Sequence, residues 1–70
     1  MQNWRAKFKN ITWRELNHIL ATKTEAEVLE MLNQERVGRR RIVVLERLHQ
    51  RYNTLRVARE RLELLNEAAR

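Results

Sequence analysis

The sequence predicts an all-α protein in which two short helices pack on one long C-terminal helix. Proline is absent, and glycine occurs only at Gly38; within a helix these residues cost about 3 and 1 kcal/mol respectively. Capping-box motifs recur at residues 12–15 and 24–27, and no helix breaker follows Gly38. The chain has 70 residues, so we expect one domain over residues 1–70.

The first residues mix aromatic and basic side chains. Trp4 and Phe8 are four residues apart, the spacing at which two side chains share a helical face. The basic residues around them are Arg5, Lys7 and Lys9. Two interpretations stay open: a terminus packed back on the core, or a flexible basic-aromatic arm over residues 1–11. Such an arm would contact a phosphate backbone and stack on bases.

Two short helices are predicted within residues 12–37, over 13–21 and 25–36. In each capping box a threonine hydroxyl accepts from a backbone N–H three residues on, and the glutamate there accepts from the threonine N–H. In the second helix Val28, Met31 and Leu32, followed by Glu35, repeat at spacings of three and four. This spacing predicts an amphipathic helix with one side on a core.

Gly38 is expected to end the second helix as a left-handed residue. The alternative is a glycine tolerated inside one longer helix. A helix over residues 39–68 would be about 45 Å long, which exceeds the width of a 70-residue globule. Its far end is therefore expected to project or to pair with another chain. The run Ile42–Leu45 is apolar on every side, so we expect it to be buried as the centre of the core.

The long helix carries an apolar seam at heptad spacing, formed first by Leu45, Leu48, Tyr52 and Leu55. A slip of one residue continues it through Ala58, Leu62, Leu65 and Ala69. One interpretation is a helix lying on its own two short helices. Because these are too short to cover the second half, we expect a homo-oligomer, favouring a dimer, through a coiled-coil-like or helical-bundle interface. The predicted interface residues are Leu48, Tyr52, Leu55, Leu62 and Leu65.

Charge is unevenly distributed. The net charge is +6, and 12 of the 15 basic residues are arginine. On a continuous helix Arg40, Arg47 and Arg51 would form a ridge beside the seam. An arginine-rich surface binds phosphates or carboxylates, so the predicted partner is a nucleic acid or an acidic protein. The residues predicted to bind it are Arg39, Arg40, Arg41, Arg47, Arg51, Arg5, Lys7 and Lys9. A plain solvated face is the alternative.

Several kinds of chemistry are not expected. The chain has no cysteine and two histidines, too few ligands for a structural zinc site. One glycine cannot make a phosphate-cradling loop, and no apolar run approaches the roughly 20 residues of a spanning helix. We also expect no pocket of about 300 Å³, the lower size of ligand sites. We therefore predict no enzyme, no cofactor, no small-molecule substrate, no membrane partner and a cytoplasmic location.

Two functions follow from these features. The first is a small helical protein-interaction module, such as an adaptor, inhibitor or assembly protein, acting as an oligomer. Arginine and aromatic residues are common at such interfaces. The second is a nucleic-acid-binding protein with weak sequence preference, because phosphate contacts give affinity without sequence readout. The acidic helix over residues 25–36 favours the first.

Overall fold

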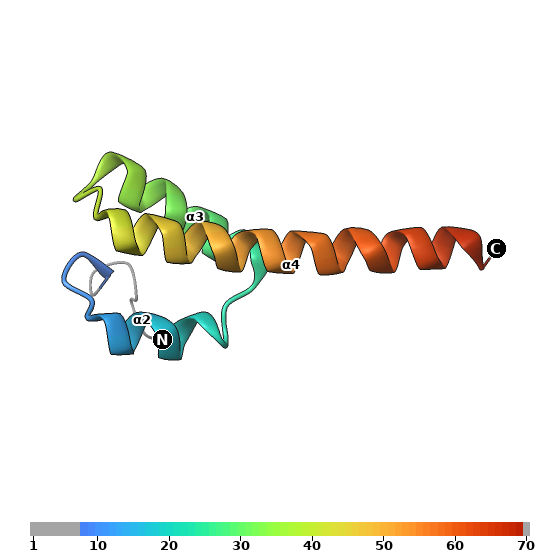
Figure 1. Ribbon diagram of the computed structural model, residues 1–70, viewed down its shortest axis with the longest axis horizontal. Coiled ribbons are helices and arrows are strands. Elements are labelled where there is room, and N and C mark those ends of the chain that lie inside the picture. The colour runs from blue at the N-terminus through green and yellow to red at the C-terminus, as the bar shows by residue number, and fades with distance from the viewer. Residues whose placement is uncertain (1–7, 70) are drawn as a thin grey trace.

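The computed structural model describes residues 8–69, and all of its regular secondary structure is helical. The elements are α2 (Trp13–Leu20), α3 (Glu25–Val37) and α4 (Ile42–Ala68). Figure 1 shows α3 and α4 as a helical hairpin, with α2 beside the first half of α4. The predicted arrangement of two short helices on one long C-terminal helix is confirmed.

Both short helices begin with the predicted capping box. The Thr12 hydroxyl accepts from the Glu15 backbone N–H at 3.2 Å, and the Glu15 carboxylate accepts from the Thr12 N–H at 3.2 Å. At α3 the Thr24 hydroxyl and the Glu27 carboxylate make the same exchange, at 3.2 and 2.9 Å. These bonds satisfy backbone donors that have no partner within the helix, which explains why the starts of α2 and α3 are fixed locally.

The predicted break at Gly38 is present, but its geometry differs from the expectation. Gly38 has φ −100° and ψ −120°, and the left-handed residue is Arg40, with φ 55°. A Cβ at Gly38 would lie 3.0 Å from the Gln34 carbonyl oxygen, so a larger residue would fit here only if that carbonyl group shifted. Residues 38–41 form a turn, and α4 begins at Ile42 instead of at residue 39.

The core lies between the three helices and is closed by the segment before α2. Leu16 and Leu20 of α2, and Val28 and Met31 of α3, have no exposed surface. The remaining buried apolar residues are Phe8, Val44 and Leu48. Phe8 is only 1% exposed, so it packs back on the core and is not part of a free arm.

The expectation for Ile42–Leu45 was wrong in part. Val44 is buried, but Ile42 and Val43 are 70% and 61% exposed. Two short helices and one N-terminal segment cover only one side of α4, so a stretch that is apolar all round keeps its outer side uncovered.

Glu35 joins the end of α3 to the start of α4. Its backbone carbonyl accepts from the N–H groups of Gly38 and Arg40. Its carboxylate, 2% exposed, accepts from the backbone N–H of Arg41 at 2.7 Å and from the Arg41 guanidinium at 2.8 and 2.9 Å. A buried carboxylate is tolerated because these hydrogen bonds replace the water it has lost.

The same guanidinium ties the hairpin to the N-terminal segment. Arg41 donates to the carbonyl oxygens of Phe8 and Ile11, at 3.2 and 3.3 Å. It also lies over the Phe8 ring, 5.6 Å from the centroid. One arginine thereby holds α3, α4 and residues 8–11 together. Arg41 was predicted to lie on a binding surface, but its side chain makes its hydrogen bonds within the fold.

Glu35 predicts a pH dependence of stability. Hydrogen bonding by Arg41 lowers the pKa of Glu35 below its ordinary value of 4.5, although burial opposes this shift. A carboxyl group whose pKa is lower in the folded state stabilises the fold above its unfolded pKa and loses this contribution as pH falls through the folded pKa. We expect Glu35→Gln to reduce the free energy of unfolding at pH 7 and the difference from the native chain to shrink below about pH 4. Urea titrations at several pH values measure this; a pH-independent difference would contradict it.

The second half of α4 extends beyond the rest of the molecule. The molecule measures 46 × 28 × 20 Å, and Figure 1 shows the C-terminal part of α4 running away from α2 and α3. The last ion pair between α3 and α4 joins Glu25 to Arg59, at 2.9 Å, and residues 57–69 are all exposed. The expectation that the far end of this helix projects is confirmed.

Candidate interaction surface

The predicted basic residues do not form a ridge along α4. Arg40 precedes the helix and Arg39 lies in the same turn, so neither shares a helical face with Arg47 and Arg51. Arg47 donates to the Asn17 side chain at 2.7 Å and so connects α4 to α2. Arg51 is half-buried. Arg5 and Lys7 lie outside the described residues.

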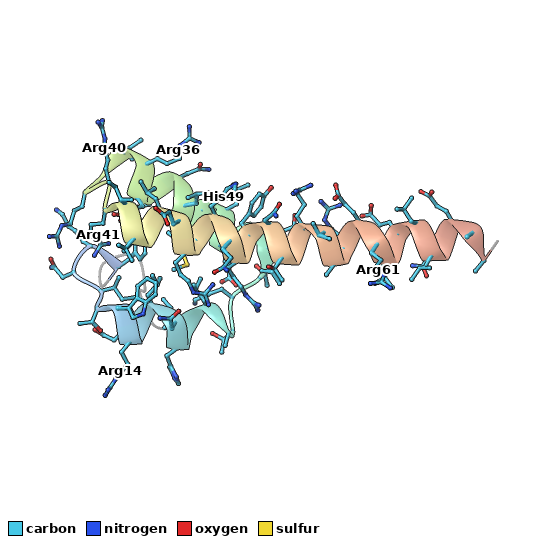
Figure 2. All side chains as sticks on the ribbon, viewed as in Figure 1. Arg14, Arg36, Arg40, Arg41, His49 and Arg61 are labelled. Carbon is cyan, nitrogen blue, oxygen red and sulfur yellow. The ribbon has the colours of Figure 1, made fainter. Side chains whose placement is uncertain are left out.

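Basic residues instead gather at the end of the molecule that contains the turn between α3 and α4. Figure 2 shows Arg36 and Arg40 pointing outward from α3 and the turn, and Arg14 pointing outward from α2 on the opposite side of this end. Arg39 donates to the backbone carbonyl of Lys9 at 3.2 Å, which brings these two residues together. We call this group the basic end; its exposed members are Lys9, Arg14, Arg36, Arg39 and Arg40.

The predicted interface residues divide into two groups. Leu48 is fully buried within the chain, so it is not accessible to a partner and its assignment to an oligomer interface was wrong. Tyr52 and Leu55 are partly buried against the same core. Leu62 and Leu65 remain 59% and 58% exposed. The seam is therefore covered by the protein's own helices up to Leu55 and uncovered beyond it.

The uncovered part of α4 exposes more apolar surface than the seam alone. Val57 and Leu64 are 49% and 65% exposed, and neither was among the predicted interface residues. At about 100° per residue, Leu64 and Leu65 lie about 100° apart around the helix. The apolar face of residues 57–69 is thus broad, and Arg61 lies within it. Contiguous exposed apolar surface of this kind is typical of interaction sites.

The opposite side of this segment is polar and engaged in ion pairs. Arg56 pairs with Glu60 at 3.1 Å, and Arg59 pairs with Glu63 at 2.9 Å; in each pair the two residues are four apart on the helix. The pairing of Arg59 with Glu25 joins residues 34 apart, which the local spacing did not indicate. The hydrogen bonds that Arg59 donates to the carboxylates of Glu25 and, to a smaller extent, Glu63 raise the pKa of Arg59.

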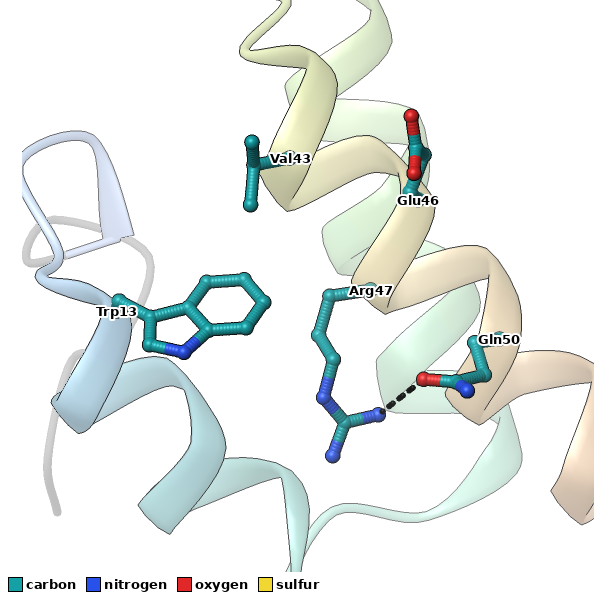
Figure 3. A pocket seen from close by; sticks show the side chains of 5 residues that line it. All are labelled: Trp13, Val43, Glu46, Arg47 and Gln50. Carbon is teal, nitrogen blue, oxygen red and sulfur yellow. Dashed lines mark hydrogen bonds between the residues drawn. The ribbon is translucent and has the colours of Figure 1, made fainter.

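An open cleft lies between α2 and the first half of α4. Its volume is about 470 Å³, and it is lined by Trp13, Val43, Glu46, Arg47 and Gln50. Figure 3 shows the Trp13 ring on one wall and Val43 on the other, with Arg47 donating to Gln50 at 3.4 Å. The expectation that the fold is too thin for a pocket above about 300 Å³ was therefore wrong. Trp13 is 51% exposed, so the cleft has an apolar wall open to solvent.

Residues 8–69 contain no cluster of three or more histidine, aspartate or glutamate side chains placed to hold a metal ion. Within the same residues no helix is long and apolar enough to cross a membrane.

Comparison of the chain with protein-family models, with curated proteins and with solved structures finds no match.

Proposed function

We propose that this chain is a small, non-enzymatic helical interaction module that acts as an oligomer through the projecting half of α4. The observation that carries the proposal is the exposed apolar face of residues 57–69, which no other part of residues 8–69 covers. Exposing an apolar face to water is unfavourable, and pairing with another helix would bury this face. An amphipathic helix laid against a second helix is a common mode of protein recognition.

Replacing Leu62 and Leu65 together with glutamate is expected to abolish association while leaving the core intact. Both side chains are exposed in the single chain, so the change adds charge to the apolar face without touching Leu48 or Met31. We expect the native chain to melt at temperatures that rise with protein concentration and the variant to melt independently of concentration.

A matched control also introduces two glutamates, but at positions outside the apolar face of residues 57–69. His49 on α4 and Asn33 on α3 are exposed and lie outside residues 57–69, and Figure 2 shows His49 pointing away from Arg61. His49→Glu combined with Asn33→Glu should retain the concentration dependence. Equal loss of association in both variants would indicate a general effect of charge and would contradict a role for the apolar face.

The basic end supports a second candidate function, binding to nucleic acid. Four of its exposed side chains lie on or beside the turn between α3 and α4, namely Lys9, Arg36, Arg39 and Arg40, and the acidic Glu35 near them is buried in its pair with Arg41. Arginine and lysine bind the phosphate backbone without regard to sequence. The candidate surface is thus the turn between α3 and α4, and not a ridge along α4.

The nucleic-acid candidate predicts binding to duplex DNA with a steep dependence on salt. Each phosphate contact contributes about −0.9 to the slope of log K against log salt concentration. Arg36→Gln combined with Arg40→Gln should flatten that slope by about two units per chain. The control is Arg56→Gln combined with Arg59→Gln, because both arginines are in ion pairs. This control should change the salt slope less. Absence of binding at low salt, measured by fluorescence anisotropy, would reject this candidate.

A further inference from the structure

We infer that a second copy of this chain binds with its α4 antiparallel to the first, and that its C-terminal end enters the cleft beside Trp13. The inference rests on the proposed self-association and adds its direction, its register and the site that receives the tip of the helix. Three features support it: an exposed stripe along α4, the charges within that stripe, and the two walls of the cleft.

The exposed stripe runs along the whole of α4. At about 100° per residue, side chains three or four apart lie on the same side of a helix, and a series with these spacings runs from the cleft to the tip. All of its members are exposed. They are Val43, Glu46, Gln50, Thr54, Val57, Arg61, Leu64 and Ala68.

The residues of the stripe have the same spacing when counted from either end of α4. Val43, Glu46 and Gln50 are separated by three and then four residues, as are Leu64, Arg61 and Val57 in reverse order. Two antiparallel copies whose midpoint lies between residues 53 and 54 therefore bring Leu64 of each copy to Val43 of the other. In the same register Val57 meets Gln50, and Arg61 meets Glu46.

The charges favour this direction over the parallel one. In the antiparallel register each Arg61 faces a Glu46, twice in the dimer, whereas a parallel dimer in register places each of these residues beside its own copy. Like charges directly opposite each other are destabilising. Among residues 8–69, neither Glu46 nor Arg61 takes part in an ion pair, so both charged groups are available to a partner.

The cleft has the shape that the tip of the helix requires. One wall is Trp13 on α2 and the other is Val43 on α4, as Figure 3 shows. The tip likewise has two apolar sides, Leu64 in the stripe and Leu65 beside it. A helix lying in the cleft would place the first against α4 and the second against α2, and would bury the exposed ring of Trp13. Burial of a large aromatic side chain contributes strongly to such interfaces.

Disulfide cross-linking tests the direction, and the cysteine-free chain allows it without background. Thr54→Cys, near the midpoint, should cross-link in this dimer and also in a parallel dimer that pairs the stripe in register. Leu64→Cys alone should not, because two antiparallel copies in this register hold residue 64 about 31 Å apart. Val43→Cys with Leu64→Cys should cross-link efficiently between copies, since these positions face each other.

The outcomes separate the inference from the proposed function. Cross-linking of Leu64→Cys alone would show a parallel dimer and overturn the inference while leaving self-association in place. Cross-linking of Thr54→Cys without cross-linking of the double variant would overturn the register. A chain that stays a folded monomer and forms no cross-link with any of these variants would overturn both the inference and the proposed function.

Charge exchange provides an independent test. Glu46→Arg or Arg61→Glu alone should weaken dimerisation by about tenfold, because each change replaces two attractive contacts with two repulsive ones. The combined variant should recover most of the affinity. Both residues are exposed, so circular dichroism should show an unchanged helix content. Failure of the combined variant to recover affinity would contradict the pairing of Arg61 with Glu46.

Discussion

Replacing Glu35 with alanine is expected to destabilise the fold by about 3–5 kcal/mol, the usual cost of removing one partner of a buried ion pair. The carboxylate receives three hydrogen bonds from Arg41, so its loss leaves the partly buried guanidinium without its counter-ion and the Arg41 backbone N–H without an acceptor. A chain of this length has a free energy of unfolding of only several kcal/mol. We therefore expect Glu35→Ala to be largely unfolded at 37 °C, as measured by circular dichroism and urea titration.

The exposed ion pair between Glu25 and Arg59 provides the matched control. Its side chains are 26% and 48% exposed, and exposed pairs contribute about 0–1 kcal/mol. Glu25→Ala should therefore lower the free energy of unfolding by less than about 1 kcal/mol. A similar loss in the two variants would contradict the structural role assigned to Glu35.

Replacing Leu48 with alanine is expected to cost about 2–5 kcal/mol, through lost apolar burial and the cavity left in the core. Leu48 has no exposed surface and packs among the core residues of α2 and α3. The same substitution at Leu64, which is 65% exposed on the same helix, should leave the stability of the single chain nearly unchanged. Urea titrations at a concentration low enough to keep the chain monomeric measure both.

A large cost at Leu64 and a small one at Leu48 would mean that the core lies in the second half of α4. That result would contradict the division of this helix into a covered half and a projecting half.

Features set by local interactions were predictable from the sequence. The starts of α2 and α3 follow from hydrogen bonds between residues three apart, and these can be recognised in any short stretch. The length of α4 follows from the absence of proline and glycine after Gly38. Its projection follows from comparing that length with the size of a small globule.

Features that depend on which residues come together were not predictable in the same way. The start of α4 was placed three residues too early, because the turn is fixed by hydrogen bonds from Gly38, Arg40 and Arg41 to Glu35. One indication was present: Glu35 occupies an otherwise apolar position on α3, which suggests a buried carboxylate in need of a partner. Its partner, Arg41, lies six residues further along the chain and across the turn, so the helical spacing of the sequence could not identify it.

The candidate surface was predicted only in part. Leu62 and Leu65 were recognised from the heptad spacing, but Leu48 was assigned to the same interface because periodicity cannot distinguish a side covered by the protein's own helices from an uncovered one. Trp13 and Val43 lie on different helices, so the cleft between them appears only when α2 is placed beside α4.

Sedimentation equilibrium of the unaltered chain tests the central proposal most directly. If the projecting half of α4 mediates self-association, the weight-average mass at micromolar concentration should rise above the 8.6 kDa of the single chain. It should approach twice that value as concentration increases. A constant mass of 8.6 kDa over the whole range, from a chain whose circular dichroism remains fully helical, would contradict the proposal.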